Sequence, residues 1–173
     1  MLQNSQSTEA TDRGDDQRTS VDGNDVLEKA MLNLEQIIKI NCAVVTHDPL
    51  PTVWAEEVML VQIFQNLIGN AIKYRSKKRP MVHVSAGTGD RQEWVFSVKD
   101  NGIGIDPRYA EQIFNIFNRL HGSKYPGAGI GLAICKRVVE HLGGAYLGGI
   151  EVRAGFRLQV HNPAQGLNRW VKR

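Results

Sequence analysis

The chain has 173 residues, of which 42% are hydrophobic and 23% charged, proportions typical of one folded domain with a sizeable core. Its net charge of +3 is too small to indicate a nucleic-acid-binding protein, and no apolar stretch approaches the roughly 18 residues that a membrane span needs. The N-terminus also lacks the apolar core of a signal peptide. We therefore expect a soluble, cytoplasmic protein that contacts neither nucleic acid nor membrane.

The two ends of the chain are expected to lie outside the folded domain. Residues 1–20 are polar and predict a disordered tail or a vector-derived remnant, the domain is expected to span 21–162, and 163–173 are expected to form a C-terminal tail. Cys42 and Cys135 form no CxxC pair, so neither a disulfide scaffold nor a zinc site is predicted. Both cysteines are expected to be small core residues.

The first part of the domain predicts one helix and two short strands. Apolar residues recur at helical spacing from Val26 to Ile38, and Asn24 stands where a helix cap is expected. The β-branched segments 43–46 and 52–55 predict brief strands, because the prolines between them exclude a helix.

The strongest helical pattern covers residues 56–74. Its expected buried stripe consists of Val58, Val61, Phe64, Leu67, Ile68, Ala71 and Ile72. Residues 81–85 and 93–99 then predict the two strands of a hairpin, and the second strand ends beside Asp100.

The remainder predicts two helices and two strands. Residues 107–117 are expected to form a short helix capped by Asp106, followed by a loop over 119–129. A further helix is expected over 130–142, with Leu132, Cys135, Val139 and Leu142 on its apolar side. The closing strands are expected near 145–147 and 156–160.

Three polar residues share one face of the 56–74 helix. Asn66, Asn70 and Lys73 are spaced by four and three residues, which places them within about 60° of each other around the helix. The spacing alone also fits an ordinary solvent-exposed face. Two carboxamides and one ammonium are nevertheless a set that can hold a hydrated divalent cation and a polyphosphate.

Glycines mark two further candidate sites, and 11 of the 17 lie between Gly102 and Gly155. In Asp100-Asn101-Gly102-Ile103-Gly104, a carboxylate at a strand end can accept a hydrogen bond from an exocyclic amine such as that of adenine. A simple turn with Asp as turn residue is the alternative interpretation.

The other glycine cluster, residues 127–132, opens a helix whose N–H groups and dipole suit phosphate oxygens. It is not a dinucleotide fingerprint, because a loop rather than a strand precedes it.

The motifs, in this order, resemble the conserved boxes of sensor histidine kinases. Residues 62–74 resemble the N box, 100–104 the G1 box, 114–119 the F box and 127–132 the G2 box. The likeness runs from about Val26 to Gly144 and looks closest to phytochrome-like kinases.

The resemblance implies an α+β fold, the two-layer Bergerat ATP-binding sandwich, with a mixed, mostly antiparallel sheet, helices on one face, and ATP and Mg²⁺ as ligands. By the same resemblance, Asn70 would ligate Mg²⁺, Asn66 would support the metal and the phosphates, and Lys73 would contact a phosphate. Tyr74 would border the nucleotide and Asp100 would bind the adenine amine. The other implied positions are Gly102 and Gly104 in the adenine pocket, Gly127, Gly129, Gly131 and Leu132 around the triphosphate, and Arg119, Lys124 and Tyr125 in the lid region.

The implied activity is transfer of the ATP γ-phosphoryl group to a histidine. Asn66 stands where ATP-hydrolysing relatives usually carry a glutamate that activates water, and asparagine cannot act as that base. His47, two residues before Pro49, is expected at a strand end, so the substrate histidine would belong to a separate dimerisation and phosphoacceptor domain, with a response regulator downstream. The alternatives are a non-catalytic nucleotide-binding module and an anti-sigma-type serine kinase.

Three departures from the family pattern accompany the likeness. The F box has Asn115 and Ile116 where an acidic residue and proline are usual, Ala128 replaces a common threonine, and no G3 box follows Gly144. These departures predict a weakened nucleotide site or a rebuilt final hairpin.

Overall fold

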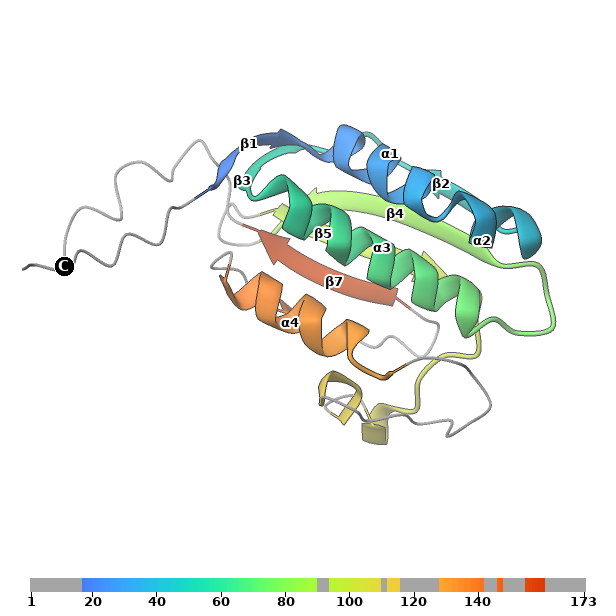
Figure 1. Ribbon diagram of the computed structural model, residues 1–173. Coiled ribbons are helices and arrows are strands. Elements are labelled where there is room, and N and C mark those ends of the chain that lie inside the picture. Colours follow the sequence, from blue (N-terminus) through green and yellow to red (C-terminus); the bar gives the residue numbers. More distant parts are fainter. Residues whose placement is uncertain are drawn as a thin grey trace, which may run out of the picture.

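The computed structural model describes residues 17–89, 94–109, 112–115, 128–141, 146–147 and 155–160. Its helices lie together on one face of a five-stranded sheet, so the described chain forms two layers (Figure 1). The strands are β1 (Thr19–Asp22), β2 (Val44–His47), β3 (Thr52–Ala55), β4 (Met81–Thr88), β5 (Trp94–Asp100), β6 (Tyr146–Leu147) and β7 (Gly155–Val160). The helices are α1 (Gly23–Asn33), α2 (Glu35–Ile40), α3 (Glu57–Lys73) and α4 (Gly131–His141), with the 3₁₀ turns η1 (Pro107–Tyr109) and η2 (Gln112–Phe114).

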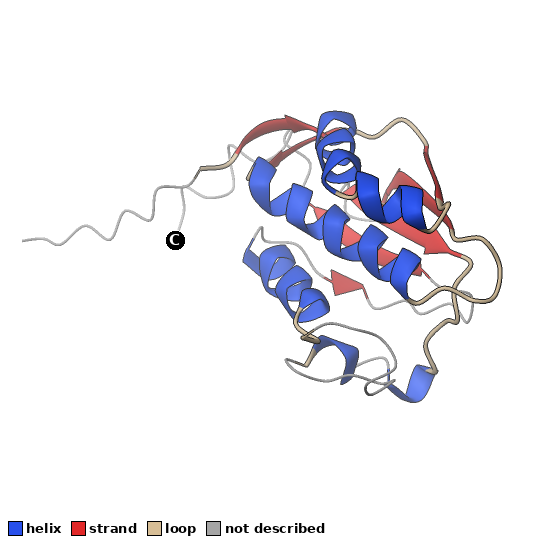
Figure 2. Cartoon of the chain, turned by 45° about the vertical axis from the view of Figure 1, so that its right-hand side comes forward, coloured by secondary structure: helices blue, strands red, loops and turns tan. Residues whose placement is uncertain are grey.

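The five-stranded sheet has the strand order β2-β4-β5-β7-β6. β2 runs parallel to β4, and the other neighbouring pairs of this sheet are antiparallel. β1 and β3 form a separate antiparallel pair. Figure 2 shows the helices in front of the sheet after a 45° turn, and the predicted α+β sandwich with a mixed, mostly antiparallel sheet is confirmed.

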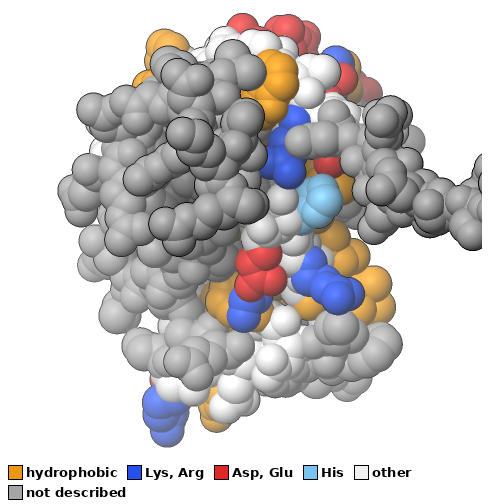
Figure 3. Space-filling model, turned by 90° about the vertical axis from the view of Figure 1, so that its left-hand side faces the viewer, with side chains coloured by type: hydrophobic (Ala, Val, Ile, Leu, Met, Phe, Trp, Pro, Cys, Tyr) orange, Lys and Arg blue, Asp and Glu red, His pale blue; other side chains and the backbone are white. Residues whose placement is uncertain are grey.

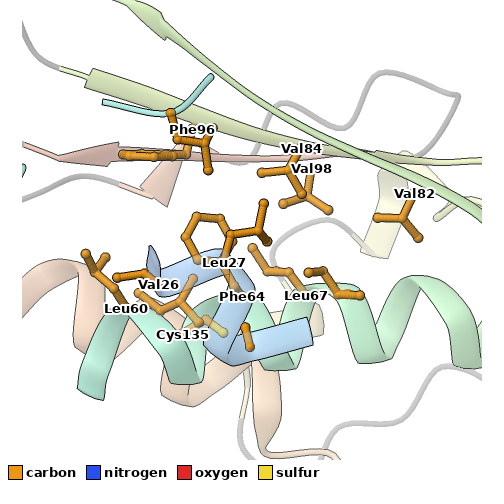
Figure 4. Close-up of a cluster of buried hydrophobic side chains, with 14 of the residues drawn as sticks. Val26, Leu27, Leu60, Phe64, Leu67, Val82, Val84, Phe96, Val98 and Cys135 are labelled. Carbon is orange, nitrogen blue, oxygen red and sulfur yellow. The ribbon is translucent and has the colours of Figure 1, made fainter. Parts of the chain in front are cut away.

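The helix α3 occupies the middle of the helical layer, because it packs against α1 and against α4 (Figure 1). Its buried residues are Leu60, Ile63, Phe64, Leu67, Ile68, Ala71 and Ile72. In Figure 4, Phe64 and Leu67 extend toward the sheet residues Phe96 and Val98. The rings of Phe64 and Phe96 meet edge to face with their centroids 5.8 Å apart. Full burial of a side chain of this kind contributes roughly 1.5–3 kcal/mol, so α3 is firmly held along its length.

The buried stripe of α3 differs from the predicted one at its N-terminal end. Val58, predicted to be buried, is 78% exposed, and Val61 is only half-buried. Leu60 and Ile63 lie on the buried face in their place. At about 100° per residue, Val58 is rotated about 120° from Phe64, which excludes it from the face that Phe64 shares with the sheet.

Residues 26–38, predicted as a single helix, belong to two helices. α1 ends at Asn33 and α2 begins at Glu35, with Leu34 between them at φ −100° and ψ 4°. Leu34 is buried, whereas α2 buries none of its own residues. The break between the two helices therefore falls at Leu34, a buried residue of the hydrophobic core.

The first turn of α1 is capped by Asp22 and not by Asn24 as predicted. The Asp22 side chain accepts a hydrogen bond from Asn24 N at 2.7 Å. The Asn24 side chain instead binds the main chain of Leu50, accepting from Leu50 N and donating to Leu50 O, each at 3.0 Å. Gly23 N donates to Pro51 O at 3.1 Å, so three hydrogen bonds hold the loop before β3 against the start of α1.

Three further segments differ from expectation. β1 begins at Thr19, two residues inside the segment predicted as a tail. The described part of 107–117 contains the turns η1 and η2 in place of one helix, although Asp106 does act as a cap by accepting from Arg108 N at 3.0 Å. Short pieces without a continuous apolar face commonly form such i→i+3 turns. Cys42, predicted in the core, is exposed at a φ of 49°, because it lies in the turn between α2 and β2.

One face of the described chain carries charges of both signs (Figure 3). On the face in Figure 3, acidic, basic and hydrophobic side chains alternate among the coloured residues, which form no single-sign patch there. No helix in the described part of the chain is long and apolar enough to cross a membrane.

Candidate functional site

A groove of about 610 Å³ runs between α2 and the C-terminal half of α3. Asn66, Asn70 and Lys73 line it together, as their spacing predicts, and all three are half-buried. Its other lining residues are Ile37, Asn41, Gln65, Gly69, Ile72, Arg75 and Ser76. The described lining thus holds two cations and four carboxamides but no carboxylate, which suits an anionic ligand.

The turn after β5 lies on the C-terminal end of α3. β5 ends at Asp100, and three residues later Ile103 N donates a hydrogen bond to Tyr74 O at 3.0 Å. Tyr74 directly follows α3, and the Lys73 Nζ lies 4.8 Å from the centre of its ring. The carboxylate of the Asp-Asn-Gly motif is therefore brought to the same end of α3 as the polar face.

Both predicted glycines of this turn are required by its geometry. A Cβ at Gly102 would lie 2.6 Å from Tyr74 O and 2.7 Å from Asp100 Oδ1, far inside normal contact distance. Gly104 has a φ of 71°, in the left-handed region that favours glycine. The backbone can therefore approach α3 closely only with glycine at these positions.

The Asp100 side chain is partly withdrawn from solvent. Gly102 N donates to Asp100 Oδ1 at 2.7 Å. Burial raises the pKa of Asp100 above its ordinary value, and the hydrogen bond from Gly102 opposes this by a smaller amount. A partly desolvated carboxylate interacts strongly with any N–H donor that reaches it, because water competes less for the hydrogen bond.

The start of α4 meets the middle of α3. Gly129 turns the chain toward the helix with a φ of 72°, and α4 begins at Gly131. The Asn66 Oδ1 lies 3.1 Å, and its Cγ 3.5 Å, from the position that a Cβ on Gly131 would take. The first N–H groups of a helix have no acceptor inside the helix and carry the positive end of its dipole, so this junction suits a phosphate. Leu132 packs partly buried against the core.

The other ends of α3 and α4 are joined by a histidine and a glutamate. His141 Nε2, at the end of α4, lies 3.1 Å from Glu56 Oε1, directly before α3. Together with the contact between Asn66 and Gly131, this shows that α3 and α4 lie antiparallel. The two contacts lie toward opposite ends of the interface between α3 and α4.

The structure gathers most of the predicted site along the C-terminal half of α3, from Asn66 to the residues that follow the helix. These positions are Asn66, Asn70, Lys73, Tyr74, Asp100, Gly102, Gly104, Gly129, Gly131 and Leu132. Arg119, Lys124, Tyr125 and Gly127 lie outside the described residues. Two of the positions that depart from the family pattern, Asn115 and Ala128, are exposed.

Two residues without a predicted role also shape the site. Asn101 accepts from Met81 N at 2.9 Å and donates to Arg79 O at 2.8 Å, which pins the turn to the start of β4. Its position inside the Asp-Asn-Gly motif was the available signal, since asparagine commonly bonds to nearby backbone in turns. Cys135 is buried on α4, where burial raises the pKa of its thiol to about 12 and the nearby Asn66 side chain lowers that pKa by a smaller amount; nothing in its local sequence indicates this neighbour.

Comparison with known sequences gives a consistent set of similar proteins. Residues 55–166 match the family described as histidine kinase-, DNA gyrase B-, and HSP90-like ATPase. The chain is 55% identical over 115 residues to cyanobacterial phytochrome A of Nostoc sp., covering 66% of this chain and 15% of that protein. It is 47% identical over 135 residues to phytochrome-like protein Cph1 of Synechocystis sp., covering 76% of this chain and 18% of that protein. The chain thus spans less than a fifth of the length of either relative.

Solved structures are similar over most of the chain. Full-length ShkA, solved in complex with AMPPNP, has a TM-score of 0.69 and 30% identity, covering 83% of this chain and 30% of ShkA. The catalytic domain of histidine kinase ThkA has a TM-score of 0.70 and 21% identity, covering 84% of this chain and 95% of that domain. The second similarity concerns the fold alone.

Proposed function

The chain belongs to the histidine kinase-, DNA gyrase B- and HSP90-like ATPase family, and on that premise we propose that it is the ATP-binding catalytic domain of a sensor histidine kinase. It transfers the γ-phosphoryl group of ATP to a histidine on a separate dimerisation and phosphoacceptor domain, from which a response regulator is phosphorylated. The observation that carries the proposal is the convergence of the Asn66, Asn70 and Lys73 face, the Asp100 turn and the start of α4 along the C-terminal half of α3.

The site supports roles for the adenine and for the phosphates of ATP. Asp100 accepts a hydrogen bond from the adenine amine, with the close approach that Gly102 allows. Lys73 contacts a phosphate, and the glycine-rich entry to α4, including Gly129 and Gly131, surrounds the triphosphate. This assignment follows the resemblance residue by residue, and the groove supplies the cationic and amide lining that it requires.

The same side chains fit a magnesium ion delivered with the nucleotide. Mg²⁺ prefers oxygen ligands and usually keeps several waters while it binds substrate phosphates. Asn70 offers a neutral carboxamide oxygen, and Asn66 offers a second beside it. No carboxylate is found among the described groove-lining residues, so the negative charge that the ion needs comes from the phosphates. When bound, the ion would neutralise phosphate charge that develops during transfer.

Transfer to histidine demands little acid–base chemistry from this domain. The attacking imidazole nitrogen carries its own lone pair. Its bond to the γ-phosphorus forms as the bond from that phosphorus to the β,γ-bridging oxygen breaks, and ADP leaves. Asn66, a carboxamide, cannot take a proton from water as a glutamate would. Positioning and charge stabilisation supply most of the catalysis in such reactions.

The histidines of the described chain support an external substrate. His47 ends β2, as predicted, His83 lies within β4, and His141 ends α4 beside Glu56. None of these three described residues lies within a helix that continues past it. The proposal therefore places the substrate histidine on a partner domain, and it places the phosphorelay in the cytoplasm.

Nucleotide binding tests the first part of the proposal. Titration with Mg²⁺-ATP should show saturable binding that Asp100→Ala and Asn70→Ala each weaken at least tenfold, while circular dichroism and the melting temperature remain near those of the wild type. Val58→Ala is the matched control, because Val58 is 78% exposed on the same helix. Unchanged affinity in both site variants would refute the assignment.

Phosphotransfer tests the second part. The chain is mixed with γ-labelled ATP and the dimerisation domain of a phytochrome-like kinase, and the label on that domain should be acid-labile, as phosphohistidine is. Acid-stable label on a partner would instead indicate the serine-kinase alternative. ATP binding without transfer to any tested dimerisation domain would favour the non-catalytic module.

A further inference from the structure

The carboxylate of Asp100 stands at the very end of β5. Asp100 pairs with Val82, and this pair closes the ladder between β4 and β5. Val82 and Val98 are buried and point toward the helices (Figure 4), and residues two apart on a strand share one face. Asp100 therefore lies on the helix-covered face. A slip of one residue in the pairing would carry it to the other face of the sheet.

Asn101 completes the pairing of this strand end with its side chain. Its main-chain N–H donates to Met81 O at 3.3 Å, as in a regular antiparallel pair. The reciprocal bond from Met81 N goes to Asn101 Oδ1 at 2.9 Å, where a regular pair would use the main-chain oxygen. Asn101 Nδ2 donates to Arg79 O at 2.8 Å. One side chain thus holds the end of β5 against the start of β4, and the main chain is left to turn.

The turn is held on its other side by α3, through the hydrogen bond of 3.0 Å from Ile103 N to Tyr74 O. Between these two attachments, Gly102 N donates to Asp100 Oδ1 at 2.7 Å. Among the described residues no donor reaches Asp100 Oδ2, so that oxygen is left to accept from a ligand. The carboxylate is therefore fixed by its neighbours and still has one acceptor to offer.

We propose that Asn101 is a positioning residue that sets the nucleobase specificity of the site, because it fixes the Asp100 carboxylate where a base must present an N–H donor. The inference rests on the proposed function, in which Asp100 accepts from the adenine amine. Hypoxanthine has a carbonyl oxygen where adenine has that amine, so a fixed carboxylate would face another acceptor and reject this base. A carboxylate on a loosened strand end turns away and tolerates both bases.

The affinities for Mg²⁺-ATP and Mg²⁺-ITP, which carry adenine and hypoxanthine, measure this specificity. The wild type should bind ATP at least about tenfold more tightly, as expected for a hydrogen bond to a charged group. Asn101→Ala removes both side-chain hydrogen bonds and should lower this preference at least about threefold, within the range of coupling between residues in contact. Asn101→Ser retains a hydroxyl acceptor on a shorter side chain and should give an intermediate preference, and it carries the test if the alanine variant does not fold.

Asn24→Ala is the matched control for stability. The Asn24 carboxamide also binds a main-chain N–H and C=O, those of Leu50, each at 3.0 Å. Its removal should lower the free energy of unfolding in urea, as that of Asn101 does, and leave the preference for ATP over ITP at the wild-type value. An unchanged preference in the folded Asn101 variants would overturn the specificity role, even if both nucleotides bound more weakly, because a purely structural loss weakens both alike.

A second substitution shows whether Asn101 acts through Asp100. The double variant Asp100→Asn/Asn101→Ala should have the same preference between ATP and ITP as Asp100→Asn alone, because no carboxylate remains to be positioned. A further change of preference in the double variant would show that Asn101 acts on the base by another route, and would overturn the positioning role.

The wild-type measurements separate failure of this inference from failure of the proposed function. No binding of ATP to the wild type would refute both together. Equal binding of ATP and ITP would refute the adenine role of Asp100 and this inference, and would leave nucleotide binding intact. A wild-type preference for ATP that the Asn101 variants retain in full would refute this inference alone.

Discussion

The main-chain oxygen of Tyr74 accepts a hydrogen bond from the N–H of Ile103 at 3.0 Å. This bond joins the end of α3, which carries the proposed metal and phosphate ligands, to the turn that carries the proposed adenine ligand. The same oxygen lies 2.6 Å from the place that a Cβ on Gly102 would occupy. The two halves of the site are therefore mechanically coupled, and a displacement of the turn changes the position of Asp100 relative to Asn70.

Gly102→Ala should damage both stability and nucleotide binding. The new methyl group would meet backbone at 2.6 Å, which cannot be relieved by rotating a side chain, and overpacking of this kind costs about 1–3 kcal/mol. We expect a lower free energy of unfolding in urea and a loss of Mg²⁺-ATP affinity of at least tenfold. Gly87→Ala is the control, because nothing lies within 4 Å of a Cβ there. A Gly102→Ala protein with wild-type affinity would show that the turn tolerates displacement.

Asp100→Asn should separate stability from binding. Burial raises the folded-state pKa of Asp100 above its unfolded value, so the ionised carboxylate costs stability at pH values above that raised pKa, and stability recovers as the pH falls through it. The variant should therefore unfold at neutral pH with an equal or higher free energy than the wild type. Its ATP affinity should be much lower, because the amide is a weaker acceptor than the carboxylate. A large loss of stability on this substitution would contradict the expected sign.

As the pH is lowered, the wild type should begin to lose ATP affinity at a higher pH than it would if Asp100 had the pKa of an ordinary aspartate. Protonation of Asp100 removes the acceptor for the adenine amine, and its raised pKa brings this loss closer to neutral pH. Titration by calorimetry between about pH 4 and 7 measures it, with Asp100→Asn as the reference that reports the protonation of ATP itself. Asp106→Asn should behave as the wild type, because Arg108 lowers the pKa of Asp106 to about 2. An identical acid response in wild type and Asp100→Asn would refute the assignment.

Asn24→Ala should destabilise the domain without affecting the site. The substitution removes both hydrogen bonds to Leu50 and leaves a backbone N–H and C=O of a buried residue without those partners. Loss of such partners costs about 1–3 kcal/mol. Urea unfolding should show this decrease, while ATP affinity at low temperature stays unchanged. Asn33→Ala, at the last position of the same helix α1 and exposed, is expected to have little effect.

The two cysteines should differ sharply in reactivity. Cys42 is exposed, whereas Cys135 is fully buried with a pKa raised to about 12, and the thiolate is the reactive species. Ellman's reagent at pH 8 should therefore label one thiol in the native protein and two in denaturant. Cys42→Ser should abolish the native reaction. Rapid native labelling in that variant would mean that the α4 interface opens readily.

The spacing of apolar residues was sufficient to predict α3 and β5, the two elements that carry the site residues. The period of α3 and the alternation of β5 placed Asn66, Asn70 and Asp100 on the right elements, because each element buries a regular apolar face. The resemblance then supplied what spacing alone does not, namely that these elements converge. The elements converge because the turn at Gly102 packs against the C-terminal end of α3, a contact between segments distant in sequence.

The differences arise where contacts distant in sequence override a local preference. Asn24 has the chemistry of a cap, but the main chain of Leu50 competes for its side chain and Asp22 takes the cap position. A helical pattern continued through Leu34, yet burial of that residue coincides with the break between α1 and α2. Cys135 is buried as predicted, and its proximity to α3 arises only because α4 packs on α3, which the local sequence does not indicate.

The position of α3 between α1, α4 and the sheet lowers the conformational-entropy cost of ligand binding. An element packed on three sides exchanges its amide hydrogens only through the largest unfolding events, so the amides around Phe64 and Leu67 should be among the slowest to exchange. Asn66 and Asn70 project from that same backbone. The ordering of these ligands is therefore completed during folding, and nucleotide binding has to immobilise only the side chains themselves.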